Sequence, residues 1–450
     1  MKADVADAEF SRRRSLGSAA WATIQQFVTL GSTALSGIIL ARILSVSDFG
    51  IFSYATSLAS MGMVVVTAGL SGLALKLLVS ERENERALMT GLILTREFFA
   101  LVAYIVLLGV ALLSGSSANV AATAIALLVM FSRAFDASEY WFQSRTESSK
   151  TAPIRIVVVL VFLGIRILFA IAGADLIVFL VLYVVESVIV SVGLIVRFSR
   201  DPRSPGFGRP EAATPRRMLR SSWLLLLSGI AGQINSRGDV IIVQALLGNA
   251  ALGLYSAAAR LSELFYFLPV VFMTATFPRL INIRKKFGRE SAQYRTELQR
   301  SYDQSCWVGI GIAVVVFVCG PWVLALLYGA RYSDAGAILQ VHVLALPFVF
   351  MAAVFSKWII AENLLVASLI RHAFGAALNV GLNLLLVPSV GLTGAAYSTV
   401  VSYFVSSYLA CFATRSTRQA GIQMSLALVW PVRLAFSVSK KFLKKGSPHE

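Results

Sequence analysis

The chain has 450 residues, of which 57% are hydrophobic and 14% are charged, and its mean hydropathy is +0.76. Soluble domains carry about 25% charged residues, so this composition excludes an ordinary soluble protein and indicates a multi-pass membrane protein. The net charge of +17 can indicate nucleic-acid binding. In a polytopic protein, however, the placement of Lys and Arg sets the orientation in the membrane.

The first segment, 1–16, is polar and contains Arg12, Arg13 and Arg14. No short apolar core with a cleavage site follows, so we expect a cytoplasmic segment and no removable signal peptide. Apolar stretches then follow, each long enough for the roughly 20 residues of a membrane-crossing helix, and we count about twelve of them. Their centres are Leu30, Met63, Ala103, Leu127, Leu163, Tyr183, Gly232, Leu264, Val314, Phe348, Leu378 and Val401.

The sixth and seventh stretches are separated by residues 199–220, which are rich in Pro, Gly and Arg. This composition is typical of a flexible linker, here on the cytoplasmic side. We therefore predict an N-lobe over 17–198, a C-lobe over 221–414 and a basic tail over 415–450. The predicted fold class is an all-α polytopic membrane protein with two six-helix lobes around a central cavity.

The two lobes resemble one another in sequence. Residues 44–58 (LSVSDFGIFSYATSL) align with residues 247–261 (LGNAALGLYSAAARL) at a constant offset of 203. Five positions are identical: Leu44/Leu247, Gly50/Gly253, Ser53/Ser256, Ala55/Ala258 and Leu58/Leu261. Six helices per lobe give both lobes the same orientation, so we expect parallel repeats with a substrate path between them.

Of the 40 Lys and Arg residues, 33 fall in alternate loops and at the two ends of the chain, and five lie within the apolar stretches. Lys357 and Arg371 flank the tenth-to-eleventh connection on that side, whereas Arg42 and Arg331 lie in the opposite loops. The positive-inside rule then places both termini in the cytoplasm. The same asymmetry removes the need for a nucleic-acid partner.

The end of the chain, Gly421 to Lys445, is apolar at first and ends in four lysines. We expect a helix that lies in the inner membrane interface. A thirteenth crossing would place those lysines outside.

Several charged residues fall within the predicted crossings. Arg133 and Asp136 are three residues apart, as are Arg260 and Glu263, so each pair shares a helix face and could form an ion pair. Arg166 has no acidic residue within one turn, and Glu186 on the next helix lies at a similar depth. Charges at this depth are costly unless they are paired or face a wet cavity.

The segment Asn235 to Asp239 (NSRGD) lies inside the seventh crossing. Arg237 and Asp239 project about 200° apart around a helix, so one of them must face a cavity or a different neighbour. Arginine binds phosphate through paired hydrogen bonds and stays charged at depth. We therefore predict a cavity for an anionic substrate and two ion-coupling acids; simple bridging between helices remains the alternative. The predicted substrate-binding residues are Arg166, Arg237, Arg260, Arg133 and Asn235, and the ion-coupling candidates are Asp239 and Glu186.

The sequence lacks GxxxxGK[ST], HExxH and paired-cysteine motifs, so we expect neither P-loop ATP hydrolysis nor a metal or other cofactor. The outer loops are short, for example residues 114–119 and 388–391. A membrane glycosyltransferase or polymerase would need more room for its acceptor.

Three segments resemble bacterial polysaccharide flippases of the multidrug/oligosaccharidyl-lipid/polysaccharide (MOP) exporter superfamily. They are residues 42–54 (RILSVSDFGIFSY), 235–255 (NSRGDVIIVQALLGNAALGLY) and 382–397 (LNLLLVPSVGLTGAAY). The resemblance implies a MATE-like arrangement of two lobes that rock about a central cavity. It also implies transfer of an undecaprenyl-pyrophosphate-linked oligosaccharide between the leaflets of the bacterial cytoplasmic (inner) membrane for polysaccharide biosynthesis, such as that of O-antigen or exopolysaccharide, without catalysis.

Two other functions stay open: a cation-coupled multidrug exporter of the same superfamily, and a membrane glycosyltransferase or polymerase. If the protein is a flippase, we expect its partners to be the lipid-linked oligosaccharide and membrane lipids. A polysaccharide polymerase and glycosyltransferases are further candidates. No nucleic-acid partner is expected.

Overall fold

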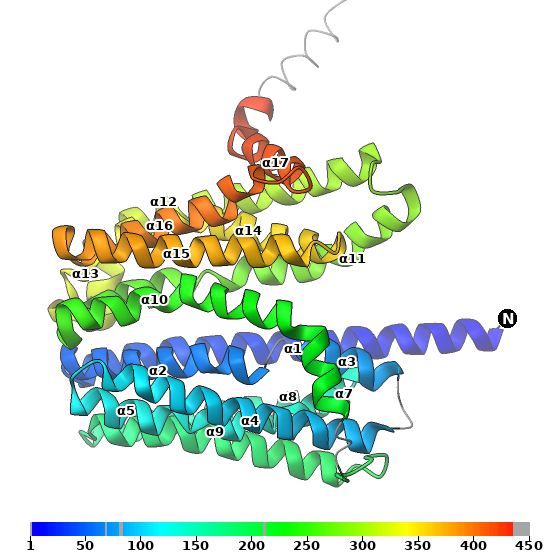
Figure 1. The fold of residues 1–450 in the computed structure, drawn as a ribbon, viewed down its shortest axis with the longest axis horizontal. Coiled ribbons are helices and arrows are strands. Elements are labelled where there is room, and N and C mark those ends of the chain that lie inside the picture. Colours follow the sequence, from blue (N-terminus) through cyan, green and yellow to red (C-terminus); the bar gives the residue numbers. More distant parts are fainter. Residues whose placement is uncertain (1, 68–69, 81–83, 210–212, 435–450) are drawn as a thin grey trace, which may run out of the picture.

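The computed structural model describes residues 2–67, 70–80, 84–209 and 213–434, with side chains placed for 17–67, 72–80, 84–209 and 223–434. In these ranges every regular element is a helix (Figure 1). The first half contains α1 (Lys2–Ile43), α2 (Val46–Thr67), α3 (Leu70–Ser80), α4 (Glu85–Leu112), α5 (Ser117–Leu127), α6 (Val129–Ala134), α7 (Ala137–Ser144), η2 (Ser148–Lys150), α8 (Ala152–Ile171) and α9 (Leu176–Ser199).

The second half of the chain begins with a long helix, α10, which lies between the helices of the first half and most of those of the second half in Figure 1. Its elements are α10 (Ala213–Glu263), α11 (Phe267–Phe287), α12 (Ala292–Tyr328), η3 (Ala330–Tyr332), α13 (Ala335–His342), η4 (Val343–Ala345), α14 (Leu346–Ala361), α15 (Leu365–Val390), α16 (Leu392–Ser407), η5 (Leu409–Phe412) and α17 (Arg418–Leu428).

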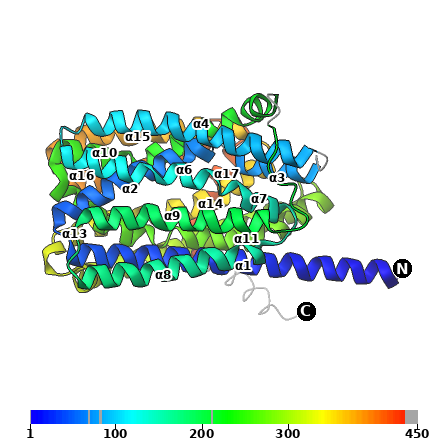
Figure 2. The same cartoon turned by 90° about the horizontal axis from the view of Figure 1, so that it is seen from below.

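The helices form two bundles whose axes run in one common direction, as Figures 1 and 2 show from two sides. In the lower bundle α1 packs on α8, α2 packs on α4 and α5, and α8 packs on α9. In the upper bundle α15 packs on α10 and α16, and α12 packs on α14. The principal seam between the bundles is formed by α2 and α10.

The described residues contain 11 helical segments long and apolar enough to cross a membrane. One of them, 223–287, has 65 residues, whereas a bilayer core of about 30 Å needs only about 20. Gly248 breaks this segment because its φ of 81° and ψ of −177° are not helical. The segment therefore makes two crossings, and the prediction of about twelve is confirmed.

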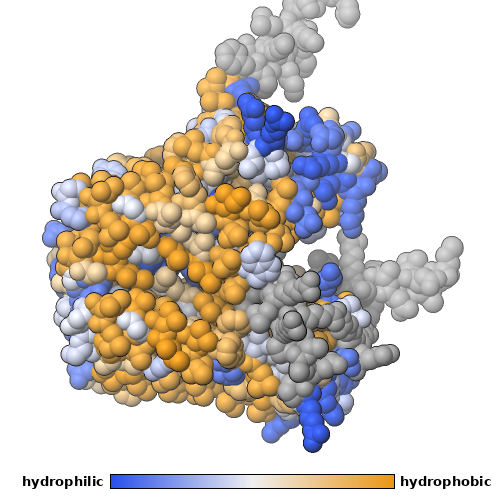
Figure 3. Space-filling view, viewed as in Figure 1, coloured by the Kyte–Doolittle hydropathy of each residue, from blue (hydrophilic) through white to orange (hydrophobic). Residues whose placement is uncertain are grey.

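The hydropathy of the surface changes along the direction of the helix axes. The face in Figure 3 is hydrophobic across its middle, and hydrophilic residues gather at the two ends of the helices. Large apolar side chains such as Ile105, Leu168, Val318 and Leu385 are more than 60% exposed. A lipid environment accounts for this exposure, since water would make it unfavourable.

One end of the bundle seam is closed by direct packing between the lobes. Phe49 of α2 lies edge-on to Tyr328 and Tyr332, with ring centroids 6.4 and 6.0 Å apart. Arg42, at the end of α1, donates its Nε hydrogen to the Leu327 carbonyl at 2.7 Å. These contacts join the two lobes at this end.

The linker and the tail are described only in part. Residues 210–212 of the linker and 435–450 of the predicted tail, which include the end of the predicted interfacial helix, lie outside the described residues. In the described part of the tail, α17 packs on α12 through Ala420, Met424 and Ala427. Trp307 donates its indole hydrogen to the Ala427 carbonyl at 2.9 Å, which fixes this docking.

Candidate functional site

The seam between α2 and α10 carries the central candidate site. It brings together three of the predicted residues, Arg237, Asp239 and Arg260. The full lining is Ser53, Ser57, Arg237, Asp239, Val240, Tyr255, Ser256, Ala259, Arg260 and Glu263. The space between them is about 10 Å³, which is room for about one water molecule. The predicted chamber is thus closed in this conformation.

Arg237 is ion-paired inside this site. Its Nη2 lies 2.7 Å from Glu263 Oε2, and the side chains are 30% and 18% exposed. The two residues lie on opposite sides of Gly248, where the helix is broken and the chain turns back. This reversal of the chain, and not the spacing along one helix, brings them together. The expected pairing of Glu263 with Arg260 is wrong because Arg237 occupies that carboxylate.

Arg260 has only neutral partners in the described chain. Its Nη2 donates to Ser53 Oγ at 3.3 Å and Thr56 Oγ1 at 3.4 Å, both on α2. Its guanidinium also lies 5.4 Å and 5.8 Å from the ring centroids of Phe49 and Phe52. Long hydrogen bonds to hydroxyls and ring faces leave a full positive charge at the lobe seam.

Asp239 lines the same pocket as Arg237, although the two residues project about 200° apart around a helix. It is 4% exposed and accepts hydrogen bonds from the Tyr255 hydroxyl and from Thr399 Oγ1 at 3.5 Å. Its own helix contributes the Val240 backbone N–H at 2.9 Å. No basic residue pairs with Asp239 in the described chain, so its carboxyl group is held by neutral donors.

An asparagine pair lies on the helix next to Asp239. Asn379 and Asn383 of α15 are fully buried, and Asn383 Nδ2 donates to the Asn379 carbonyl at 2.8 Å and to its Oδ1 at 3.2 Å. Asn379 Oδ1 lies 3.6 Å from the position of a Cβ on Gly238. The buried Asn379 oxygen of α15 therefore lies against α10 beside Gly238.

Arg166 and Glu186 form an ion pair between α8 and α9, as the sequence indicates. Arg166 also donates to Ser36 of α1 at 3.3 Å. The next residue of α1, Gly37, faces Arg260, whose Nη1 is 3.4 Å from the Cβ position. The predicted N-lobe pair thus lies behind α1 rather than in the central pocket.

Arg133 is also outside the central pocket. The expected partner, Asp136, is bound instead by Arg155 at 3.2 Å, which also binds Glu139 at 3.1 Å. The Arg133–Asp136 pairing is therefore wrong. Arg133 Nε is buried without an acceptor.

Asn235 lines a different cavity. That cavity lies within the C-lobe, between α10, α11, α14, α15 and α16, and does not include Arg237 or Arg260. The side chain of Asn235 is 4% exposed, and its Oδ1 has no hydrogen-bond donor in the described chain.

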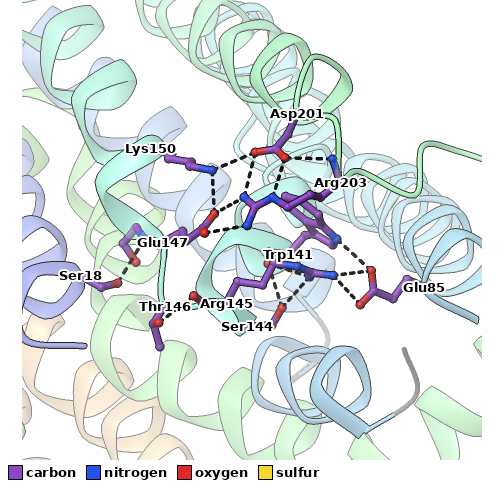
Figure 4. Close-up of polar contacts among 11 residues, drawn as sticks. Ser18, Glu85, Trp141, Ser144, Arg145, Thr146, Glu147, Lys150, Asp201 and Arg203 are labelled. Carbon is purple, nitrogen blue, oxygen red and sulfur yellow. Dashed lines mark hydrogen bonds and ion pairs between the residues drawn. The ribbon is translucent and has the colours of Figure 1, made fainter. Parts of the chain in front are cut away.

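A polar cluster at one end of the N-lobe was not predicted from the sequence (Figure 4). Glu85 accepts two hydrogen bonds of 2.7 Å from Arg145 and one of 3.0 Å from the Trp141 indole. Arg145 also lies 4.0 Å from the centroid of the Trp141 ring. These contacts join α4 to α7 through residues that are far apart in sequence.

The same cluster holds the chain that follows α9. Arg203 binds Glu147 through hydrogen bonds of 2.9 and 2.6 Å, and it also binds Asp201. Lys150 bridges the same two acids at 2.8 and 3.0 Å. The hydrogen bonds from Arg203 lower the pKa of Glu147 to about 2, and they likewise lower the pKa of Asp201.

Comparison with known families gives the assignment. The family model described as polysaccharide biosynthesis protein matches residues 15–284, and the model described as lipid II flippase MurJ matches residues 205–440. Each covers more than half of the 450 residues. The chain belongs to the polysaccharide biosynthesis protein family. This places it among the polysaccharide flippases of the MOP superfamily, which are transporters rather than enzymes.

Two curated relatives come from Haloferax volcanii. The chain is 20% identical over 373 residues to the probable low-salt glycan biosynthesis flippase Agl15, covering 82% of this chain and 77% of the relative. It is 28% identical over 177 residues to the probable flippase AglR, covering 38% of this chain. The latter match spans 36% of that relative's length.

Solved structures show the same fold. The inward closed conformation of the lipid II flippase MurJ superposes with a TM-score of 0.69 at 15% identity, covering 92% of each chain. An inward-facing multidrug MATE transporter superposes with a TM-score of 0.67 at 15% identity, covering 96% of this chain and all of that one. At this identity the likeness concerns the fold alone, and it confirms the predicted MATE-like arrangement.

Proposed function

We propose that this protein moves an undecaprenyl-pyrophosphate-linked oligosaccharide across a bacterial cytoplasmic membrane for polysaccharide biosynthesis. The family assignment and the two relatives named as probable flippases support a flippase. The two arginines of the central site support a substrate that carries a pyrophosphate. The lobes would separate at the seam, admit the head group and close behind it, with the lipid tail remaining in the bilayer.

The observation that carries this proposal is the uncompensated charge of Arg260. Its guanidinium lies between the lobes, and among the described residues it is held by hydroxyls and ring faces. A pyrophosphate oxygen offers a stronger, charge-assisted hydrogen bond than a serine or threonine hydroxyl. The substrate would therefore displace Ser53 and Thr56 when the lobes part.

Arg237 supplies a second cation whose charge is cancelled at rest. The pair with Glu263 cancels the charge of Arg237 in the closed seam, so that Arg260 carries the uncompensated charge. An entering pyrophosphate would compete with Glu263 for Arg237, which would add a second cation to the site. Arg133 and Arg166 would line the N-lobe part of the route once the lobes have moved, and Asn235 would contribute from the C-lobe.

Asp239 and Glu186 are the proposed ion-coupling acids. Asp239 is buried among neutral donors, so uptake of a proton or Na⁺ would remove an isolated charge. Glu186 would be released from Arg166 if a substrate phosphate took its place. Both exchanges would link occupancy of the seam to an ion gradient.

The remaining proposals concern the setting of the protein. Both termini would be cytoplasmic, and a polymerase and glycosyltransferases would act before and after transfer. The residue ranges 17–198 and 221–414 would move as the two lobes, joined by 199–220, with 415–450 forming a basic interfacial tail.

The test is reconstitution of the full chain in liposomes that contain an undecaprenyl-pyrophosphate oligosaccharide. A glycosidase added outside measures how much of the sugar initially shielded in the inner leaflet becomes accessible. We expect the protein to expose this pool well beyond the level in protein-free liposomes. Movement of cationic dyes without the glycolipid would favour the multidrug exporter, and sugar transfer to an acceptor would favour an enzyme.

A further inference from the structure

The C-lobe contains a second cavity, whose lining shares no residue with the pocket of Arg237 and Arg260. It measures about 220 Å³ and is lined by residues of five helices, α10, α11, α14, α15 and α16. Most of its wall is apolar, including Val270, Val349 and Ala352, but Arg371 and Asn235 also face it. A pocket of this volume is below the roughly 300–1,000 Å³ of ordinary small-molecule sites, so it suits a compact group rather than an oligosaccharide.

Arg371 is the unusual member of this wall. The charge pattern places it in a cytoplasmic connection, yet its side chain lies in α15 and the residue is only 4% exposed. Among the described residues no carboxylate lies within ion-pair distance of it. Its neighbours are Ser356 Oγ at 3.1 Å, His372 Nε2 at 3.0 Å and the ring of Phe355, whose centroid is 5.0 Å away.

These neighbours do not compensate the charge. The Arg371 Nε hydrogen is buried and has no acceptor, and His372 accepts from Arg371 only as a neutral imidazole. A buried guanidinium without an anionic partner is strongly unfavourable. An anion bound in the adjacent cavity would fill the cavity and compensate the charge of Arg371.

Asn235 provides an independent second group. Its side-chain amide lines the same cavity, and its Oδ1 is buried without a donor among the described residues. This Oδ1 lies 3.2 Å from the Cβ position of Gly375, which is one turn after Arg371 in α15. The O and N atoms of an amide are assigned from their partners. A 180° turn of this amide would place its N–H donors where Oδ1 now lies without a donor, and a bound anion would accept from them.

We propose that this C-lobe cavity is a binding site for one oxyanion group of a single negative charge, a phosphate or carboxylate, held by Arg371 and Asn235. One arginine balances one charge, and its planar fork donates two parallel hydrogen bonds to an oxyanion. The apolar part of the wall would contact the hydrocarbon or ester portion of a larger ligand.

Two sources would supply this chemistry. Val270 at the rim is 50% exposed, and Phe267 one turn earlier lies edge-on to Phe27 of α1, with ring centroids 5.1 Å apart. An anionic phospholipid would thus reach the cavity with its head group from the seam between α1 and α11. A free inorganic anion would reach it from solution.

The experiment measures the unfolding temperature of the full purified chain under matched conditions. One series places the protein in nanodiscs of phosphatidylcholine with or without phosphatidylglycerol. The other adds sodium phosphate or acetate to protein in neutral detergent, with sodium chloride at equal ionic strength as the reference. Ligand that binds only the folded state raises the unfolding temperature, and we expect a rise of about 2 °C or more.

Three variants make the result decisive. Arg371→Gln should abolish the rise, whereas Arg279→Gln, which removes an arginine whose side chain is 66% exposed, should keep it. Ser356→Asp places a carboxylate beside Arg371, since Ser356 Oγ is already 3.1 Å from Nη2. This variant should be more stable than the wild type without an added anion, and it should no longer respond to one.

The outcomes separate the sources. A rise with phosphatidylglycerol alone identifies a lipid head group, and a rise with phosphate or acetate in detergent identifies a free anion. No rise in either series, or an equal rise in Arg371→Gln, overturns the proposal. Arg260→Ala should retain the rise, so failure of the flippase proposal and failure of this one can be told apart.

Discussion

Gly50 and Gly253 make reciprocal contacts across the lobe seam. A Cβ on Gly50 would overlap the carbonyl oxygen of Asn249, and a Cβ on Gly253 would overlap the carbonyl oxygen of Val46. Gly50 and Gly253 are equivalent positions of the internal repeat, and so are Val46 and Asn249. Reciprocal contact between equivalent positions is what a two-fold relation between the lobes requires.

Alanine at either glycine should therefore open this end of the seam. The overlap is with backbone, which cannot rotate away, so the lobes must separate or the helices must shift. We expect Gly50→Ala and Gly253→Ala each to destabilise the closed arrangement by about 1–3 kcal/mol, as overpacking does. Distances between spin labels on α2 and α10 would report the change.

Gly311→Ala is the matched control, since no neighbouring atom lies within 4 Å of its Cβ position. It should leave the label distances unchanged. Unaltered distances in the two seam variants as well would contradict the close packing described here.

The pair Arg237–Glu263 should show charge reciprocity. Arg237→Glu alone places two acids together, and Glu263→Arg alone places two bases together, so we expect each to lower stability by about 1–3 kcal/mol, discounted for partial exposure from the larger value of a buried pair. The double exchange should restore most of the loss. Thermal unfolding in detergent measures this, and two additive losses would show that the residues do not interact.

The cluster in Figure 4 should make stability depend on acid pH. Hydrogen bonds from Arg203 lower the pKa of Glu147 from its ordinary value of 4.5 to about 2. The stabilisation is therefore fully present above pH 4.5 and is lost as the pH falls toward 2, because the unfolded chain takes up the proton first. Glu147→Gln should flatten the stability profile over this range.

Unfolding temperatures between pH 5 and pH 2.5 would measure that effect. Glu290→Gln is the control: this glutamate pairs with Arg295 but its side chain is 74% exposed, and exposed pairs contribute little. Parallel profiles for the wild type and Glu147→Gln would exclude the proposed contribution of Glu147.

Asp239→Asn should separate folding from coupling. The amide keeps a polar group at the same place beside Tyr255 and Thr399, so we expect normal expression and an unfolding temperature near that of the wild type. It cannot gain or lose a proton, so transport should no longer respond to an imposed ion gradient. Full gradient dependence in this variant would remove Asp239 from the coupling mechanism.

Much of the fold could be predicted from the sequence because hydropathy and bilayer thickness determine where helices cross. The Gly50/Gly253 repeat and the Arg166–Glu186 pair were also visible, since both depend on sequence offset or depth alone. The partner of Arg237 could not be predicted, because that contact depends on the chain turning back at Gly248 rather than on helical spacing.

The burial of Arg371 shows a different limit. Positive charge near a helix end predicts a position at the membrane surface, but α15 begins at Leu365 and carries Arg371 inside the C-lobe. Asn235 likewise faces this lobe because α15 packs against α10 on that side. Which neighbour a polar side chain meets depends on tertiary packing, which periodicity does not specify.

The central claim is that the unpaired guanidinium of Arg260 binds the pyrophosphate between the lobes. Its most direct test is the rate of lipid-linked oligosaccharide transfer in liposomes by Arg260→Gln, with Arg279→Gln as the control. One charge-assisted hydrogen bond is worth about 1.5–3 kcal/mol, so we expect a loss of roughly tenfold to a hundredfold in Arg260→Gln and none in the control. Transfer by Arg260→Gln at the wild-type rate, with equal amounts of folded protein, would contradict the claim.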